Sequence, residues 1–574
     1  MDRAAFERLL KRRTSRRQAL SAGAVGGAGI IGMSFANGPT RSWARQATPA
    51  GGAPSATPVA SPVASPVASP VASPVATESS LLLRPSARFG AYPFQLGVAS
   101  GDPAANSVVL WTRLAPSLID GGGMDGVPYD VAWEVATDEA FGDVIQRGVA
   151  VADPNLAHSV HVDVTGLEPA REYFYRFMAG DEVSQTGRTK TAPAAGQAVD
   201  ALRLGIASCS NYEHGYFSGY REMAAQRLDL ILHLGDYIYE YEANDYQVRD
   251  PENLRLVPDD ETVTLSGYRN RYALYRTDPD LQAAHASAPF SVTWDDHEVD
   301  NNYADEISEE QVLIDEFRQR RADAYQAYYE HMPLRPSSLP VGPDMTLYRK
   351  LNYGDLLSIN VLDTRQYRSD HPAGDGSFPR GPANTDPQTT MLGPDQERWL
   401  LQALDESPSI WNVLAQQVTM AETYFPPADG SAIEYYNDSW TGYPAARARI
   451  LDHIAQNAIS NPVVLTGDIH TSWAADLLSD WANPDSAVIG SEYVCTSITA
   501  GGLEPADFFK AYADAFEFIR FFDPRHGGFT IAEVTPELWK ADYFVVDNME
   551  DPASGVTNIG TFVTEAGAPG VQQG

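Results

Sequence analysis

Four strongly apolar segments of strand length each lead directly into polar, potentially reactive residues. They are residues 202–207, 230–234, 290–294 and 462–466. A helix is expected between the first two, at 219–227, because its apolar residues recur with helical spacing. Short apolar runs that alternate with helices are typical of parallel strands buried on both faces. Such sheets bind ligands at the carboxyl ends of their strands, so the sequence predicts an α/β domain with its site at that edge.

The residues after these strands bring a thiol, carboxylates, a phenol and imidazoles to that edge. In chain order they are Cys209, Asp236, Tyr239, Asp296, His297, Asn301, Asp468 and His470. One acidic strand end is equally well explained as a helix cap, but this explanation is hard to extend to four strand ends in one chain. Clustered carboxylates repel one another unless they are protonated or bind cations. We therefore predict a metal site.

The charge of the chain argues against polyanionic partners. Its 41 Lys and Arg residues face 76 Asp and Glu residues, a formal net charge of −35. The long-range field of such a protein repels phosphates, so no specific nucleic-acid binding is expected. An anionic substrate would need a local cationic device, such as a few arginines or bound metal.

The cysteine content leaves few options for structural cross-links. Only Cys209 and Cys495 occur, which excludes a disulfide framework and a four-cysteine zinc site. A pairing between them stays open. We interpret Cys495 as a core residue, because it lies in an apolar run, and Cys209 as a candidate ligand.

The first 44 residues have the features of an export signal. Residues 15–20, Ser-Arg-Arg-Gln-Ala-Leu, resemble a bacterial twin-arginine signal; a general secretory signal or a retained anchor is the alternative. The apolar run at 21–36 is shorter than the ~20 residues that a membrane-spanning helix needs. We predict a signal peptide at 1–44 that is read by the twin-arginine export machinery. The mature protein, without a transmembrane anchor, would be periplasmic, cell-wall-associated or extracellular.

Composition and strand patterns divide the remainder into four parts. Residues 45–79 are predicted to be a linker, because a Ser-Pro-Val-Ala repeat fixes φ and removes backbone donors. Short strands separated by turns predict a small β-sandwich at 88–195, similar to a fibronectin type III domain, with a tyrosine corner near Tyr173. The α/β domain is placed at 200–550, and 551–574 is expected to be a C-terminal tail.

Four blocks of sequence carry a resemblance to a known family. They are Gly-Asp-Tyr-Ile-Tyr at 235–239, Trp-Asp-Asp-His-Glu at 294–298, Leu-Asp-Thr-Arg-Gln-Tyr-Arg at 362–368 and Gly-Asp-Ile-His at 467–470. These blocks resemble the calcineurin-like metallophosphoesterases, and among them the PhoD-like alkaline phosphatase/phosphodiesterase family. The resemblance implies a four-layer α/β/β/α core, Fe³⁺ and Ca²⁺ as cofactors, and hydrolysis of phosphate esters.

Two departures from the wider superfamily affect the choice of metal. Cys209 stands where an Asp-x-His block is usual, and the terminal Gly-His-x-His reads Gly-Asp-x-His here. A thiolate and a phenolate suit Fe³⁺, whereas oxygen-only ligands suit Ca²⁺, Mg²⁺ or Mn²⁺ rather than zinc. The implied ligand sets are Cys209, Asp236, Tyr239 and His470 for iron, and Asp236, Asp296 and Asp468 for the second metal region, with Asn301 as a further candidate there. Asn301 is equally explained as a turn cap.

Two further residues have expected catalytic roles. His297 would protonate the leaving oxygen or orient the phosphate, and Arg365 would bind a phosphoryl oxygen; a purely structural role is the alternative for each. The expected reaction is metal-hydroxide attack on a phosphate monoester, with release of inorganic phosphate, and diesters are a further candidate substrate class. The alternatives are a phosphodiesterase or phospholipase D-like enzyme acting on wall or lipid phosphodiesters, and a non-catalytic wall-binding protein.

Replacing both Arg16 and Arg17 by lysine should leave the precursor in the cytoplasm while the net charge stays unchanged. The expected cause is that the export machinery reads the guanidinium pair and not the sum of charges. Cell fractionation and immunoblotting of precursor and mature protein measure this. Normal export of the double variant would contradict the twin-arginine assignment.

Overall fold

The computed structural model describes residues 88–574 except 119–120, 250–251, 259, 425–431 and 504. The predicted signal peptide (1–44) and linker (45–79) lie outside the described residues. Within the described part, no helix has the length and apolar character that a membrane crossing requires.

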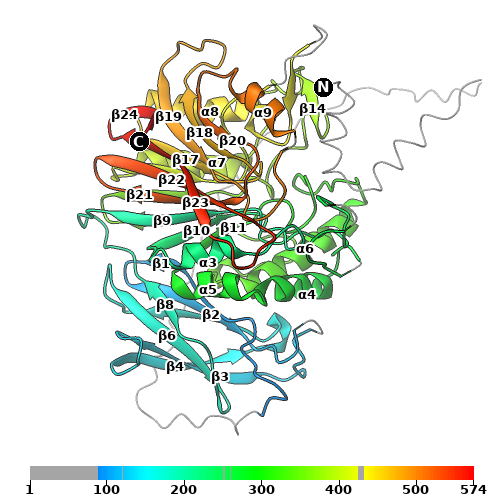
Figure 1. Cartoon of the computed structure of the whole chain (residues 1–574), viewed down its shortest axis with the longest axis vertical. Coiled ribbons are helices and arrows are strands. Elements are labelled where there is room, and N and C mark those ends of the chain that lie inside the picture. The colour runs from blue at the N-terminus through cyan, green and yellow to red at the C-terminus, as the bar shows by residue number, and fades with distance from the viewer. Residues whose placement is uncertain (1–87, 119–120, 250–251, 259, 425–431, 504) are drawn as a thin grey trace, which may run out of the picture. The chain divides into compact units, whose positions relative to one another are not determined.

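The four apolar segments form strands in two large sheets (Figure 1). Three of them are adjacent parallel strands of a ten-stranded sheet: β9 (Leu202–Ala207), β10 (Leu230–Leu234) and β11 (Phe290–Thr293). This sheet runs in the order β24-β23-β22-β21-β9-β10-β11-β1-β2-β5. Its remaining strands are β21 (Gly528–Val534), β22 (Leu538–Val546), β23 (Val556–Glu565), β24 (Ala568–Gln573), β1 (Val98–Ala104), β2 (Ser107–Arg113) and β5 (Ser159–Thr165).

The fourth segment, β17 (Pro462–Thr466), lies in the middle of a seven-stranded sheet. The order of that sheet is β12-β13-β15-β17-β19-β18-β20, and β13, β15, β17 and β19 are parallel. Its other strands are β12 (Arg349–Tyr353), β13 (Leu357–Val361), β15 (Trp411–Ala415), β19 (Val488–Val494), β18 (Ser472–Leu478) and β20 (Ile519–Asp523). A separate ribbon pairs β14 (Ser377–Pro379) with β16 (Glu434–Tyr436).

The two sheets pack face to face, and helices cover their outer faces. The inner layer is apolar and joins residues such as Leu204 and Leu232 of one sheet to Val413 and Val463 of the other. Helices that include the tyrosine-rich α4 and α6 pack on the first sheet: α3 (Ser218–Ala224), α4 (Leu265–Arg276), α5 (Pro279–Ser287) and α6 (Ile314–His331). The second sheet is covered by α7 (Gly393–Asp405) and α8 (Pro444–Gln456), while α9 (Ala506–Ala513) packs near β20. The predicted four-layer α/β/β/α core is confirmed.

The N-terminal β domain is a sandwich, but it is not separate from the α/β core. One layer contains β3 (Tyr129–Ala136), β4 (Val144–Ala152), β6 (Glu172–Ala179), β7 (Glu182–Val183) and β8 (Gly187–Lys190). The other layer is β1, β2 and β5, and β1 continues the large sheet through the pairing of Gly101 with Phe290. The Tyr173 hydroxyl accepts a hydrogen bond from the Glu168 backbone N–H at 2.9 Å, as expected for a tyrosine corner.

The expectation of a C-terminal tail at 551–574 is wrong. Residues 556–573 form β23 and β24, which extend the ten-stranded sheet beyond β22. Phe562 and Val571 are 6% exposed and belong to the core between the two sheets. The sequence signal was weak because most residues of β23 are only partly buried, so the segment lacks a continuous apolar run.

Deleting residues 551–574 should destabilise the whole protein. Full burial of a side chain such as Phe562 or Val571 stabilises by ~1.5–3 kcal/mol, and the deletion also exposes the edge of β22. We expect the free energy of unfolding to fall by about 3–6 kcal/mol, measured by denaturant titration, with part of the protein insoluble. An unchanged unfolding midpoint would restore the tail interpretation.

Candidate metal centre

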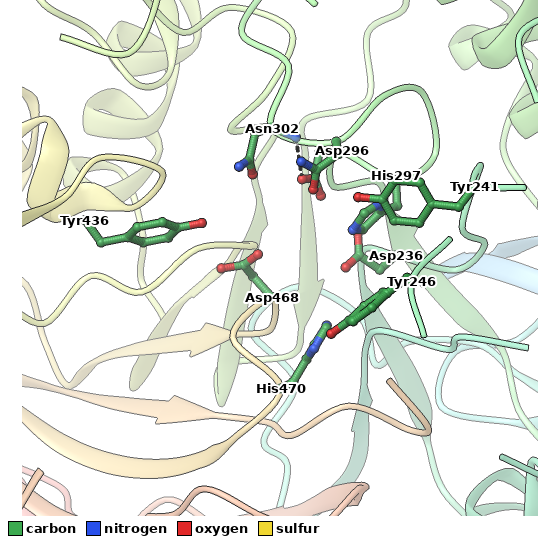
Figure 2. A pocket seen from close by; sticks show the side chains of 10 residues that line it. Asp236, Tyr241, Tyr246, Asp296, His297, Asn302, Tyr436, Asp468 and His470 are labelled. Carbon is green, nitrogen blue, oxygen red and sulfur yellow. Dashed lines mark hydrogen bonds between the residues drawn. The ribbon is translucent and has the colours of Figure 1, made fainter. Parts of the chain in front are cut away.

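The predicted ligands lie in the loops after β9, β10, β11 and β17, which meet at one edge of the two sheets (Figure 2). Four of them have left-handed backbone conformations, a region that residues with side chains rarely adopt. Their φ values are 58° for Cys209, 55° for Asp236, 62° for Asp468 and 57° for His470. Strain of this kind costs on the order of 1–3 kcal/mol per residue and gathers at functional sites.

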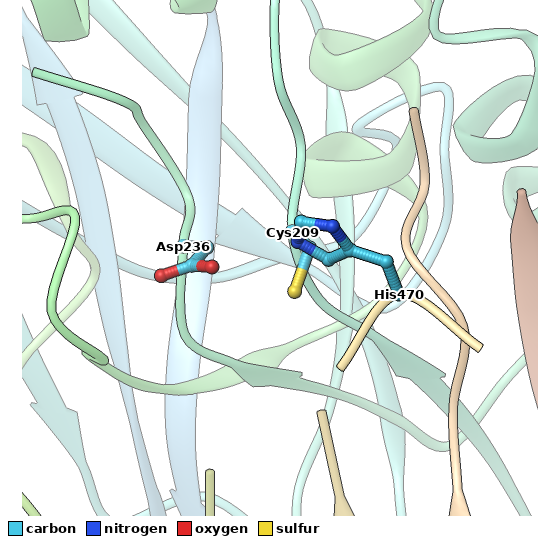
Figure 3. Close-up of side chains that lie close together, drawn as sticks. All are labelled: Cys209, Asp236 and His470. Atoms are coloured by element: carbon cyan, nitrogen blue, oxygen red, sulfur yellow. The ribbon is translucent and has the colours of Figure 1, made fainter. Parts of the chain in front are cut away.

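The thiol, one carboxylate and one imidazole form the first cluster (Figure 3). Ligand atoms of Cys209, Asp236 and His470 all lie within 4.8 Å of one another. The Tyr239 hydroxyl joins them, because it donates to Asp236 Oδ2 at 3.1 Å and lies 3.0 Å from His470 Nε2. The other ring nitrogen of His470, Nδ1, is 3.0 Å from the Gly501 carbonyl. That bond places the proton on Nδ1 and leaves the Nε2 lone pair to a ligand.

Carboxylates dominate two further clusters. Asp236, Asp296 and His297 form one, and Asp295, Asp296 and Asp468 form the other, each within 4.8 Å. Asp236 therefore belongs both to the cluster around Cys209 and to one around Asp296. Figure 2 shows Asp236, Asp296 and Asp468 directed into the same pocket.

The electrostatics of these carboxylates fit a bound cation. Burial raises the pKa of Asp236 well above its usual range; His297 opposes this rise, and the carboxylates of Asp296 and Asp295 add to it. Asp236 Oδ1 and Asp296 Oδ1 are buried and have no hydrogen-bond partner among the described residues. Buried acceptors of this kind are costly unless a proton or cation satisfies them. Together with a thiol, a phenol and an imidazole, they make a donor set suited to metal.

His297 lines the pocket, and its surroundings favour the protonated form of its ring. Its Nδ1 lies 2.8 Å from Glu240 Oε2, and its ring packs on Tyr239 with the ring centroids 4.2 Å apart. Burial lowers the pKa of His297, but the carboxylates of Glu240, Asp296 and Asp236 outweigh burial and raise it well above the usual value. Glu240 was not predicted as a site residue. It directly follows Tyr239 in the sequence, which was the available signal, but side-chain direction is not visible there.

Arg365 does not take the predicted place of a phosphate clamp. Its side chain is fully buried and does not line the pocket. Its Nε donates to Asp295, and its Nη1 and Nη2 donate to the two oxygens of Asp438 at 2.7 and 3.0 Å. All three nitrogens are thus used by carboxylates.

The other predictions for single residues have mixed outcomes. Asn301 lines the pocket, and its backbone N–H donates to Glu240 Oε1 at 2.8 Å; its role as a ligand stays a prediction. Cys209 and Cys495 are both free thiols. Cys495 lies in the core and donates to the Ile206 carbonyl, as its apolar surroundings predicted.

Sequence reasoning missed part of the pocket wall. Tyr241, Tyr246, Asn302 and Tyr436 line the pocket together with the predicted residues (Figure 2). The first two follow the Asp236 block at short spacing. Tyr436 comes from the β14–β16 ribbon, whose strands are three residues long and carry no apolar signature.

Comparison with known proteins agrees with this geometry. Residues 204–543 match the family model "PhoD-like phosphatase", and residues 77–193 match its N-terminal domain model. The chain belongs to the PhoD-like phosphatase family. It is 49% identical to alkaline phosphatase D of Bacillus subtilis (strain 168) over 489 residues, which cover 84% of this chain and 83% of that protein. A solved structure of PhoD matches with a TM-score of 0.82 and 48% identity, covering 85% of this chain and 93% of that one.

These matches confirm the family, the fold and the enzyme class predicted from the sequence. The chain is a phosphatase of the PhoD type. Membership of this family, together with the three clusters of ligating side chains, supports metal dependence.

Replacing Arg365 by methionine should destabilise the fold strongly, because Asp295 would lose its arginine partner and Asp438 would keep only Arg368 and His371. Breaking a buried pair of this kind costs about 3–5 kcal/mol, measurable by denaturant titration. Arg398 is the matched control: its pair with Asp395 is exposed, with side chains 73% and 82% accessible, so its replacement by methionine should change stability little. An Arg365→Met variant of unchanged stability but raised KM would support the clamp.

Proposed function

We propose that the pocket holds two kinds of cation and that the enzyme hydrolyses phosphate monoesters, releasing inorganic phosphate. The observation that carries this proposal is the position of Asp236. One of its neighbour sets contains a thiol, a phenol and an imidazole, and the other contains carboxylates. A carboxylate shared between two such sets is suited to bridge two metals of different chemistry.

The first set would hold Fe³⁺. Its ligands would be Cys209, Asp236, Tyr239 and His470. Thiolate and phenolate oxygen are electron-rich donors that favour a trivalent ion, and the His470–Gly501 bond supports the imidazole as a ligand. Burial raises the pKa of Cys209 well above its usual value, and the charge of Asp236 adds to this rise, so loss of the thiol proton requires a strongly bound cation.

The second set would hold Ca²⁺, with Mg²⁺ or Mn²⁺ as alternatives. Its oxygen ligands would be Asp236, Asp296, Asp468 and Asn301. Hard divalent cations prefer oxygen donors, and Asp296 Oδ1 is one of the buried acceptors that need a partner. When bound, the cations would supply Lewis acidity and a hydroxide nucleophile at neutral pH.

The protein side chains would then supply proton transfer and orientation. Glu240 holds His297 through Nδ1, which leaves Nε2 to donate a proton to the departing oxygen. Glu240, which is not among the proposed metal ligands, raises the pKa of His297 and so favours the protonated ring that a general acid requires. Small phosphate esters are the proposed substrates, and diesters are a possible extension.

Export through the twin-arginine pathway is part of the proposal. Its support is the Ser-Arg-Arg-Gln-Ala-Leu sequence at 15–20 and the proline-rich segment at 45–79. The mature enzyme would act in the periplasm, at the cell wall or outside the cell.

Tyr239→Phe should remove the visible absorption of the purified enzyme and most of its activity. A phenolate bound to Fe³⁺ gives a charge-transfer band, and phenylalanine cannot bind the ion. Absorption spectra, metal analysis of protein purified without chelator, and turnover of a chromogenic phosphomonoester measure this.

Tyr237→Phe is the matched control for this experiment. Tyr237 is equally buried, but its hydroxyl bonds to His285 Nε2 at 2.9 Å, away from the pocket. Both variants lose a buried hydroxyl, but only Tyr239→Phe removes a proposed metal ligand. Equal colour and equal rates in the two variants, or stoichiometric zinc in the active enzyme, would contradict the proposed iron site.

A further inference from the structure

The walls of the pocket contain no lysine or arginine among the described residues. Once cations have neutralised Asp236, Asp296 and Asp468, the phosphoryl oxygens that face away from these cations still need hydrogen-bond donors. Among the side chains that line this pocket, the donors are neutral groups and His297. A charged hydrogen bond to such an oxygen is worth roughly 1.5–3 kcal/mol.

Several donors in the wall or directly behind it already have partners. The Asn302 side-chain amide donates to Asp375 at 3.0 Å, and its backbone N–H donates to Asp296 Oδ2 at 2.7 Å. The Tyr239 hydroxyl lies between Asp236 and His470. His297 Nδ1 is held by Glu240. The Asn302 and Tyr239 donors are thus engaged within the site, whereas His297 keeps Nε2 for the departing oxygen.

Tyr436 reaches the pocket from the side opposite His297. Figure 2 shows its side chain extending across the pocket, with the hydroxyl directed toward Asp468 and facing the cluster of Asp236, Asp296 and His297. It lies at the end of β16, where Tyr436 pairs with Ser377. Because side chains alternate along a strand, the preceding Tyr435 points to the other face, where Arg380 lies 3.8 Å from its ring centroid.

The chain holds Tyr436 firmly through the two residues that follow it. Asn437 is fully buried; its side-chain amide donates to the Gly374 carbonyl and its backbone N–H to the Gly376 carbonyl, both at 2.9 Å. Asp438, also fully buried, is bound by Arg365, Arg368 and His371. Because the backbone next to Tyr436 is held rigidly, its phenol is pre-organised, which lowers the entropy cost of binding.

We propose that Tyr436 is a substrate-binding residue whose hydroxyl donates a hydrogen bond to a phosphoryl oxygen. This inference rests on the proposed function, because it takes the cation cluster as the place where the phosphate lies. It assigns the ribbon β14–β16 a role in recognising the phosphoryl group itself. The contact is therefore independent of the leaving group.

The test compares Tyr436→Phe with Tyr435→Phe, which removes a neighbouring hydroxyl on the other face of the same strand. Kinetics are measured with an aryl and an alkyl phosphate monoester, and binding of inorganic phosphate to the metal-loaded protein is measured by calorimetry. We expect Tyr436→Phe to lower kcat/KM by about 10- to 100-fold for both esters. Phosphate affinity should fall by a similar factor, with unchanged metal content. Tyr435→Phe should match the wild type.

Three results would overturn the inference: wild-type phosphate affinity in Tyr436→Phe, loss of metal from that variant, or equal losses in the two variants. Wild-type phosphate affinity would show that the Tyr436 hydroxyl makes no hydrogen bond to phosphate. Loss of metal would show that Tyr436 acts through the metals. Equal losses would show that both changes act by disturbing the β14–β16 ribbon. Calorimetry separates this inference from the proposed function. Tyr436-dependent phosphate binding in a protein that turns over neither ester would support the contact and contradict the proposed reaction.

Discussion

The site depends on holding several carboxylates together where water hardly reaches. Asp236, Asp295 and Asp296 are each at most 2% exposed. Burial raises the pKa of Asp236 and of Asp295 well above the usual range, so without compensation one or more would be protonated. The protein supplies part of the compensation through His297 and Arg365, and the proposed cations supply the rest. Binding of cations is thereby coupled to loss of protons from these groups.

The Arg365–Asp438 pair links the carboxylate site to the segment that follows Tyr436. Arg365 contacts Asp295 with Nε and Asp438 with its other two nitrogens. Burial opposes ionisation of Asp438, but Arg365 and Arg368 outweigh it and lower its pKa well below the usual value. Buried pairs are tolerated when each donor and acceptor is matched. Because Asp438 lies two residues after Tyr436, the same pair that steadies Asp295 also fixes the ribbon.

Strand positions and most site residues were predictable because apolar runs mark buried parallel strands, and such strands end at one edge. The direction of each side chain was not predictable from the sequence. Arg365 follows β13 much as Asp236 follows β10, yet it pairs with Asp295 and Asp438 and does not line the pocket. The C-terminal strands β23 and β24 and the ribbon carrying Tyr436 are short or half-buried, so they lack the apolar signature on which the prediction depended.

The backbone conformation of the ligand-bearing loops is the feature of the site that was least predictable from the sequence. Two glycines show how closely these loops pack: a Cβ on Gly235 would lie 2.5 Å from Asp295 Cβ, and one on Gly467 would lie 2.8 Å from Ser208 Cβ. The residues that follow these glycines, Asp236 and Asp468, have left-handed conformations. Glycine at Cys209 would relieve similar strain but would remove the thiol. Stability of the loop and ligation therefore oppose each other, and the buried strands on either side must provide the free energy that keeps the strained ligands in place.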